Sequence, residues 1–402
     1  MSLRALLTLA LAVPLAAPAE PFTPKSDAEA VQRLPYRVDA SERARRAALA
    51  RDPAQLPLAL AAARAALDRA RVLGDPRELG AAQAALAPWW TAADAPAEAV
   101  LLRARVLQAR HDFDGGLAQL RGLLARDDLA PELRAQALLD TAAIHQLRAE
   151  LPQARALCEQ LKPLAPLPAA ACLAELDSLS GNAPAAAQAL ARLSPGRTVA
   201  PWLALMRAEL AERLGDATAA GLYRQALVGA DEVYTRAALA DWLLAQDRAA
   251  EALALTQGSE ADALLLRQVI ALRRLGRDAA APTARLRDSL AAADRREPGK
   301  HAREQARFAL DVSNQPREAL RLAQANWAWQ REPADAVLLL RAAQAAGREG
   351  EAAQRELARF VRERGWQDVR LGLVNATAMG REGPPPGANQ GAARSPHSSA
   401  AQ

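Results

Sequence analysis

The sequence predicts an all-helical repeat protein, and both its composition and its periodicity indicate that fold class. Alanine accounts for 104 of the 402 residues, and aromatic residues make up only 3%. Alanine and leucine favour helices, whereas sheets are rich in β-branched and aromatic side chains. The chain is 51% hydrophobic and 24% charged. It can therefore bury a large core, and wholesale disorder is excluded.

Breaks in the helical pattern recur about every 34 residues, which is the strongest signal in the chain. We expect each break to be a tight turn between two antiparallel helices. The breaks lie near Gly74, His111, Ala149, Gly181, Gly215, Asp247, Gly276, Asn314 and Gly347.

Small residues recur on both sides of these breaks. Two helices approach most closely near a tight turn, so only a small side chain fits there without overpacking. Seven residues before the second to sixth breaks the chain carries Ala104, Ala142, Ala174, Ala208 and Ala240. Five residues after the breaks, all positions but Leu79 are alanine or glycine: Leu79, Gly116, Ala154, Ala186, Ala220, Ala252, Ala281, Ala319 and Ala352.

These features resemble the tetratricopeptide repeat family, whose unit is a helix–turn–helix of 34 residues. The resemblance covers about residues 55–365 and is carried by segments such as 214–227, 247–253 and 347–353. It implies an α-solenoid, a right-handed superhelix of about nine repeats, whose concave surface binds peptides or protein elements without catalysis. The chain departs from the family pattern in its late units, where a small residue is replaced by Val269, Arg307 and Leu340.

The N-terminus predicts a cleavable signal peptide over residues 1–19. A basic start is followed by an apolar run over 5–17 and by small residues that suit cleavage between Ala19 and Glu20. An ordinary amphipathic helix fits less well, because the run has no polar face. It is too short to span a bilayer, so we expect no integral membrane segment. We expect a periplasmic or secreted bacterial protein.

The segments that flank the predicted array have other roles. Residues 20–54 are expected to cap its first unit, and residues 366–380 are expected to cap its last. Residues 381–402 form a Pro/Gly/Ser-rich tail without an apolar period, which predicts disorder.

The positive net charge does not predict nucleic-acid binding. The chain has a formal charge of +5 and a pI of about 9.7. Residues 1–19 and 381–402 each contribute +1, and elsewhere basic and acidic side chains alternate. A phosphate-binding surface needs clustered cations. We therefore expect solvated helix faces and no nucleic-acid partner.

If the geometry of the family holds, the inner faces of the first helices line a groove that binds a partner. The alternative is that these side chains are simply solvated. Their charges alternate in blocks, which would favour a partner of mixed charge and salt-sensitive binding. The candidates are Arg105, Gln108, Asp140, Glu209, Asp241, Arg267, Arg273, Glu304, Asp311 and Arg341.

Cys158 and Cys172 are the only cysteines. They fall on neighbouring helices, so an oxidising compartment would favour a disulfide; two buried thiols are the alternative. No further cysteine or histidine lies at ligand spacing, so we expect no metal site. The chain has no P-loop, no G-x-G-x-x-G and no G-x-S-x-G motif. We therefore expect neither a cofactor nor catalytic residues.

These observations together predict a non-enzymatic periplasmic scaffold or adaptor that binds a partner protein or peptide in its groove. Assembly of an envelope complex is one process that it would serve. The alternatives are a small-molecule or metal carrier, or a helical accessory domain of an envelope enzyme.

Overall fold

The computed structural model describes residue 26 and residues 40–193 and 200–372. The chain divides into two units, Met1–Ala40 and Ser41–Gln402, and the second unit contains the helical array. The predicted signal peptide (1–19), its cleavage site and the predicted tail (381–402) lie outside the described residues, as do most of residues 20–39 and residues 373–380.

All regular elements in the described ranges are helices, and these ranges contain no strand, which confirms the predicted all-α repeat fold. Three short 3₁₀ helices accompany the α-helices: η1 (Ala87–Trp89), η2 (Gly347–Gly350) and η3 (Val369–Leu371). The α-helices are α1 (Ala40–Arg51), α2 (Leu56–Leu73), α3 (Arg77–Ala85), α4 (Ala97–Ala109), α5 (Phe113–Leu124), α6 (Pro131–Leu147), α7 (Leu151–Leu161), α8 (Pro166–Ser178), α9 (Ala183–Arg192), α10 (Ala200–Leu214), α11 (Ala219–Gly229), α12 (Val233–Ala245), α13 (Ala249–Thr256), α14 (Asp262–Arg274), α15 (Ala280–Arg296), α16 (Ala302–Asp311), α17 (Pro316–Trp327), α18 (Pro333–Ala345) and α19 (Glu351–Arg364).

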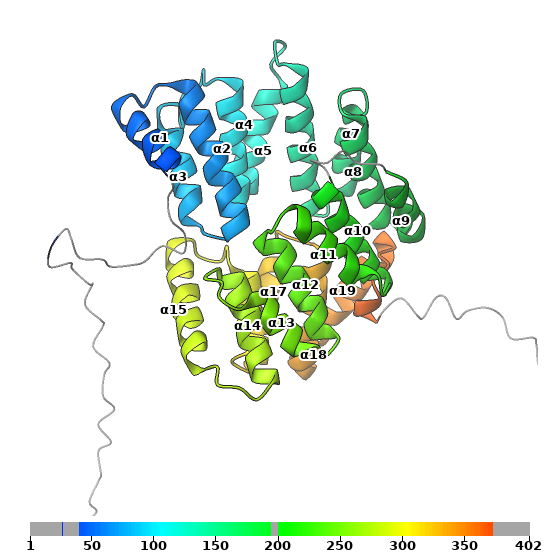
Figure 1. Cartoon of the computed structure of the whole chain (residues 1–402). Helices are drawn as coiled ribbons and strands as arrows, with labels where there is room; N and C mark the ends of the chain where they lie inside the picture. The colour runs from blue at the N-terminus through cyan, green and yellow to red at the C-terminus, as the bar shows by residue number, and fades with distance from the viewer. Residues whose placement is uncertain (1–25, 27–39, 194–199, 373–402) are drawn as a thin grey trace, which may run out of the picture. The chain divides into compact units, whose positions relative to one another are not determined.

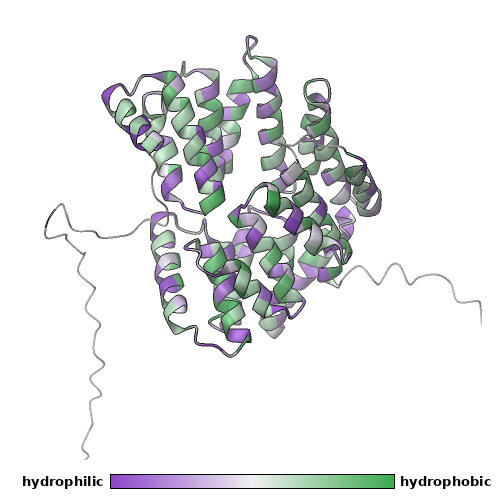
Figure 2. Ribbon diagram, in the orientation of Figure 1, coloured by the Kyte–Doolittle hydropathy of each residue, from purple (hydrophilic) through white to green (hydrophobic). Residues whose placement is uncertain are grey.

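From α2 onward the described helices form nine consecutive pairs, α2 with α3 through to α18 with α19 (Figure 1). Within each pair the two helices pack on each other, and most pairs also pack on the next. Figure 2 shows hydrophobic residues interspersed with hydrophilic ones along the helices. In the described ranges no helix combines the length and apolar character that crossing a membrane requires.

The predicted breaks coincide with the turns inside these pairs. The chain turns back there because one residue takes a left-handed conformation, which lets a following amide bond back across the turn. For example, the Asp112 N–H donates to the Leu107 carbonyl at 2.8 Å, and the Arg248 N–H donates to the Leu243 carbonyl at 2.9 Å. Positive φ angles of 51° to 85° occur at Gly74, His111, Ala149, Gly181, Gly215, Asp247, Gly276, Asn314 and Gly347.

Asp247 is a turn residue whose side chain has no buried role. Substitutions at this position therefore report mainly the free-energy cost of the left-handed backbone conformation. Its φ is 56°, and its one ion pair among the described residues, with Arg274, spans 3.8 Å at the surface. We expect Asp247→Gly to stabilise the fold by about 0.5 kcal/mol and Asp247→Val to destabilise it by about 1–2 kcal/mol. Urea unfolding checks both values. Asp127→Val, at an exposed loop position without positive φ, is the control. Equal effects at Asp127 and Asp247 would contradict this account.

Most of the predicted small residues lie buried at helix contacts. All five alanines before the turns are buried, as are six of the nine residues after them. Leu79, the one position of this set without a small residue, is half-buried. The prediction is wrong for Ala281 and Ala352, which are exposed. In the unit of Ala281, α15 begins four residues after the turn residue. In the last unit η2 precedes α19, which moves the buried position to Ala353.

Turns and helix ends of the early units contact the segments that connect helices in the late units. Lys300 Nζ donates to the His111 carbonyl at 2.9 Å, and the Arg331 N–H donates to the Leu147 carbonyl at 2.7 Å. Trp329 packs edge-on against the His111 ring, with the ring centroids 5.4 Å apart. In the same way α2 contacts α12, where Arg71 pairs with Glu232 at 3.1 Å. The array is therefore held by contacts between distant repeats as well as between neighbours.

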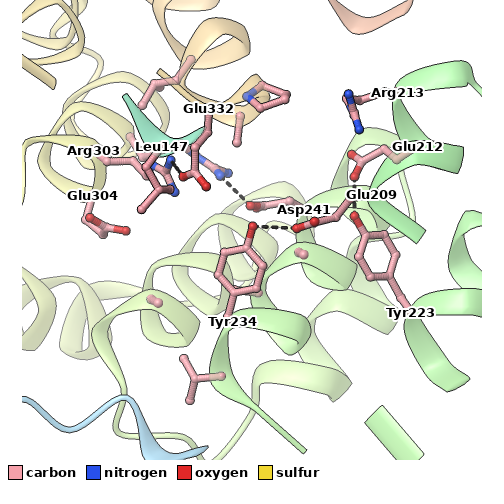
Figure 3. Close-up of a pocket in the computed structure, with 18 of the residues that line it drawn as sticks. Leu147, Glu209, Glu212, Arg213, Tyr223, Tyr234, Asp241, Arg303, Glu304 and Glu332 are labelled. Atoms are coloured by element: carbon pink, nitrogen blue, oxygen red, sulfur yellow. Dashed lines mark hydrogen bonds and ion pairs between the residues drawn. The ribbon is translucent and has the colours of Figure 1, made fainter. Parts of the chain in front are cut away.

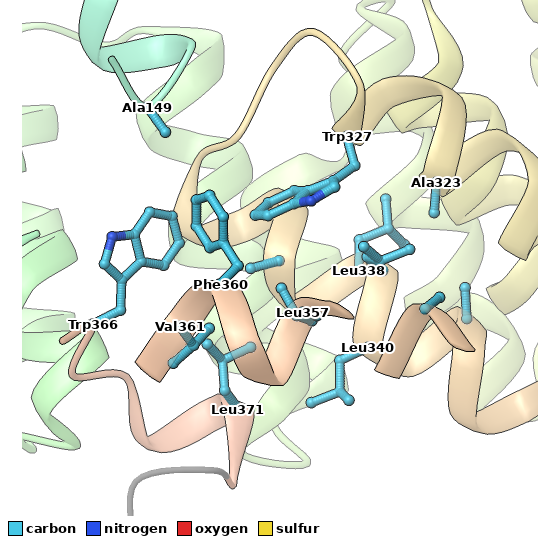
Figure 4. Packing of buried hydrophobic residues seen from close by; sticks show 14 of the residues in the cluster. Ala149, Ala323, Trp327, Leu338, Leu340, Leu357, Phe360, Val361, Trp366 and Leu371 are labelled. Carbon is cyan, nitrogen blue, oxygen red and sulfur yellow. The ribbon is translucent and has the colours of Figure 1, made fainter. Parts of the chain in front are cut away.

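The segment after α19 joins the last unit to units in the middle of the array. Trp366 is buried against Trp327 and Phe360, whose ring centroids lie 6.5 Å and 5.3 Å away (Figure 4). The side chain of Gln367 accepts a hydrogen bond from the Ala183 N–H at the α8–α9 turn. Arg370 pairs with Glu212 of α10 at 3.0 Å. The predicted cap on the last unit therefore also contacts much earlier helices.

Candidate functional site

A cavity of about 390 Å³ lies along the first helices of the later pairs (Figure 3). Side chains of α8, α10, α12, α14, α16 and α18 line it, and the ends of α2 and α6 contribute Arg71 and Leu147. Arginines and carboxylates make up much of its wall. Because its volume falls in the range of ligand pockets, roughly 300–1,000 Å³, it is the candidate site.

Asp241 is the centre of a charge network on the cavity wall. Its carboxylate accepts two bonds from Arg267, at 2.7 and 3.1 Å, and pairs with Arg307 at 2.9 Å. Burial alone would raise the pKa of Asp241, but the two guanidinium groups outweigh it and lower the pKa to about 2. Beyond the cavity the network continues, because Asp311 accepts from both Arg307 and Arg341.

Other arginines of the cavity also have carboxylate partners. Arg213 pairs with Glu175 at 3.1 Å and donates to Ser178 Oγ at 2.8 Å. Arg303 pairs with Asp335 at 2.6 Å and also with Glu332. Most of the positive charge in the wall is therefore already neutralised by neighbouring helices.

Two carboxylates of the cavity wall, Glu209 and Glu304, take part in no ion pair with any described residue. Glu209 accepts a hydrogen bond from the Tyr234 hydroxyl at 2.6 Å (Figure 3). Loss of solvent contact is the main cause that raises the pKa of Glu209 to about 7. The hydrogen bond from Tyr234 and the charge of Arg213 lower this pKa, and the nearby carboxylates of Glu175 and Glu332 raise it. Tyr234 remains 46% exposed because its ring faces the cavity. Arg331 is the one arginine of the lining without an ion pair among the described residues, and it donates to the Trp327 carbonyl at 3.0 Å. The lining groups without an ion pair are therefore two carboxylates and one guanidinium group.

Because the pKa of Glu209 is raised, we expect replacement of this residue to stabilise the fold by an amount that depends on pH. The pKa of Glu209 in the fold is above the unfolded value of 4.5. The stability that its protonated side chain contributes is therefore fully present below pH 4.5 and is lost as the pH rises through about 7. We expect Glu209→Gln to stabilise the fold by about 1–2 kcal/mol at pH 8.5 and to have little effect at pH 4.5. Because Glu209 is only half-buried, solvent screening keeps this gain below the full value of the shift.

Denaturant unfolding at the two pH values measures this difference. Glu356→Gln is the matched control, because Glu356 lies exposed on α19. A gain that is the same at both pH values, or that occurs equally in the control, would contradict a raised pKa at the half-buried Glu209.

The structure brings only part of the predicted groove together. Glu209, Asp241, Arg267 and Glu304 line the cavity. The other candidates do not line it. Arg105 and Asp140 pair with each other at 2.6 Å, Asp311 pairs with Arg341, Gln108 is half-buried on α4, and Arg273 lies exposed at the end of α14.

The sequence analysis did not select Tyr234, Glu175, Arg303 or Arg307, all of which line the cavity. A signal for Arg307 was present, because it stands where the repeat pattern expects a small packing residue. An arginine at that position has to find a carboxylate, and Asp241 and Asp311 supply it. The other three residues carry no local pattern that separates them from solvated helix positions.

Cys158 of α7 and Cys172 of α8 are joined by a disulfide, with their Cα atoms 6.0 Å apart. The bond links the second helix of one pair to the first helix of the next. When the protein is unfolded without a reductant, we expect neither cysteine to react with a maleimide. Elsewhere in the described ranges no group of three histidine, cysteine, aspartate or glutamate side chains could hold a metal ion.

The fold and the cavity define a helical-repeat protein with a charged internal cavity. Family models and curated proteins provide no match for this chain.

Proposed function

We propose that this chain is a non-enzymatic binding protein of the tetratricopeptide-repeat type, which holds a basic side chain of a partner protein or peptide in the cavity. The observation that carries the proposal is the pair of carboxylates, Glu209 and Glu304, that lack a cationic partner in a wall whose other charges are largely paired. A lysine or arginine would supply the missing positive charge, and Tyr234 offers an aromatic face beside it.

The proposed setting is the bacterial periplasm, where the protein would act as a scaffold or adaptor. This part of the proposal rests on the signal-like residues 1–19. The disulfide between Cys158 and Cys172 is in keeping with an oxidising compartment.

A photo-cross-linking amino acid in place of Tyr234 tests the proposal in cells. We expect it to capture a discrete envelope protein through a segment that contains lysine or arginine. The same group in place of Trp202, which is 38% exposed on α10 and does not line the cavity, is the control. Capture that is equal at both positions, or none at Tyr234, would contradict the proposal. A small cationic molecule that co-purifies with the protein would favour the carrier alternative.

Calorimetry with short peptides tests the chemistry directly. We expect peptides with a central arginine or lysine to bind saturably, whereas matched glutamate peptides do not bind. Binding should tighten between pH 5.5 and 8.5, because Glu209 must lose its proton to offer a charge. The double variant Glu209→Gln/Glu304→Gln should weaken binding at least tenfold and remove most of this pH dependence. Unchanged affinity in the double variant would exclude the cavity as the binding site.

A further inference from the structure

The junction between α15 and α16 differs from the other junctions of the array. In each of the other described junctions, the second helix of a pair packs against the first helix of the next pair. At this junction α15 packs against α14 but has at most marginal contact with α16. The seventh and eighth pairs are therefore held apart on this side.

The separation leaves a groove with a volume of about 890 Å³, which shares no lining residue with the cavity. Its two walls are α15 and α17, and α16 forms its floor. Leu290, Phe308 and Val312 give the floor and inner walls an apolar part, beside the polar side chains of Thr283 and Gln305. This is the arrangement that a further helix would need if its apolar side were to lie between α15 and α17.

The rim of the groove is basic. Within the described ranges neither Arg273 nor Arg287, both of which line the groove, takes part in an ion pair. The carboxylate of Asp294 accepts from the Gly299 N–H, and Glu318 pairs with Arg321. Residues 273–296 carry seven arginines and three aspartates, so this stretch has +4 of the chain's formal +5. Its field favours a negatively charged partner.

We propose that the groove between α15 and α17 is a docking site for an acidic amphipathic helix of a partner protein. The apolar face of that helix lies on Phe308 and Leu290, and its carboxylates face Arg273 and Arg287. A recessed apolar floor suits a protruding ridge of side chains. A flat anionic membrane or a nucleic-acid backbone would meet the rim and leave the floor uncovered. Arg273, which the sequence analysis assigned to the concave groove, belongs to this second surface instead.

A fluorescent peptide probe tests the proposal on the full chain. The probe has about 18 residues, or five helical turns, with leucine on one face and glutamate on the other. We expect saturable binding by fluorescence anisotropy, weakening as salt is added. The double variant Arg273→Glu/Arg287→Glu should weaken binding at least tenfold. Ala291→Trp, at an exposed position that lines the groove, should block it by filling the space.

Two controls separate this site from a general charge effect. Arg359→Glu/Arg362→Glu makes the same change in charge at exposed positions of α19 and should leave binding unchanged. A peptide in which lysine replaces every glutamate should not bind. Equal loss in the α19 variant, undiminished binding in Ala291→Trp, or preference for phosphatidylglycerol vesicles or single-stranded DNA over the peptide would overturn the proposal. Because the cavity variant Glu209→Gln leaves this groove intact, it should bind the probe normally.

Discussion

Replacing Trp366 by alanine is expected to destabilise the fold by about 3–5 kcal/mol, the cost of deleting a large buried aromatic side chain. Trp366 is 4% exposed and lies edge-on to Phe360 and Trp327. Ala149, from the α6–α7 turn, belongs to the same cluster (Figure 4). The deletion therefore weakens the last pair and its contact with an early turn together.

Denaturant unfolding measures this effect, and two further variants interpret it. Trp366→Phe should cost only about 1 kcal/mol, because it keeps an aromatic ring and removes an indole N–H that has no partner among the described residues. Trp202→Ala, at a position 38% exposed, should cost less than about 1 kcal/mol. A loss below 1 kcal/mol for Trp366→Ala would show that the segment after α19 does not hold the array together.

Replacing Asp241 by alanine is expected to lower the free energy of unfolding by about 3–5 kcal/mol, because it leaves buried charge without a partner. Arg267 would lose its carboxylate, and Arg307 would keep only Asp311. Glu251→Ala is the control, since it breaks only solvent-exposed ion pairs and should leave the free energy of unfolding nearly unchanged. Asp241→Leu/Arg267→Leu should recover part of the loss, because an apolar pair needs no counter-charge.

Acid unfolding gives this prediction a second readout. The pKa of Asp241 in the fold is about 2, below its ordinary value of 3.8. Its contribution is therefore present above pH 3.8 and is lost as the pH falls through about 2, which amounts to roughly 2 kcal/mol. Asp241→Ala should flatten the pH dependence of the unfolding free energy between pH 4 and pH 2 by that amount. An unchanged slope would show that the carboxylate is not held by its arginines.

Local signals in the sequence predicted the repeat architecture well. The turn residue of each pair has positive φ even where it is His111, Ala149, Asp247 or Asn314. The break in helical periodicity identified these turns, and glycine alone would have missed four of the nine. The predicted position of the buried small residue was wrong near Ala281 and Ala352, because small changes in linker length move that position by a residue or more.

Local signals could not predict the cavity in the same way. A charged residue on the inner face of a first helix looks the same in the sequence whether it meets solvent, a partner or another helix. Arg105 and Asp140, 35 positions apart, satisfy each other, whereas Glu209 finds no cation among the described residues. The difference depends on how successive pairs are rotated and spaced, which no single repeat encodes.

The helical class, the length of the repeat and the position of each turn can thus be read from the chain, because each depends on a few neighbouring residues and on steric limits of the backbone. Contacts between distant repeats cannot be read in this way. The position of Trp366, the surroundings of Glu209 and the opening between α15 and α16 arise only when small displacements add up over many pairs. Such contacts depend on the summed geometry of the array, and they set the charge and shape of both proposed binding surfaces.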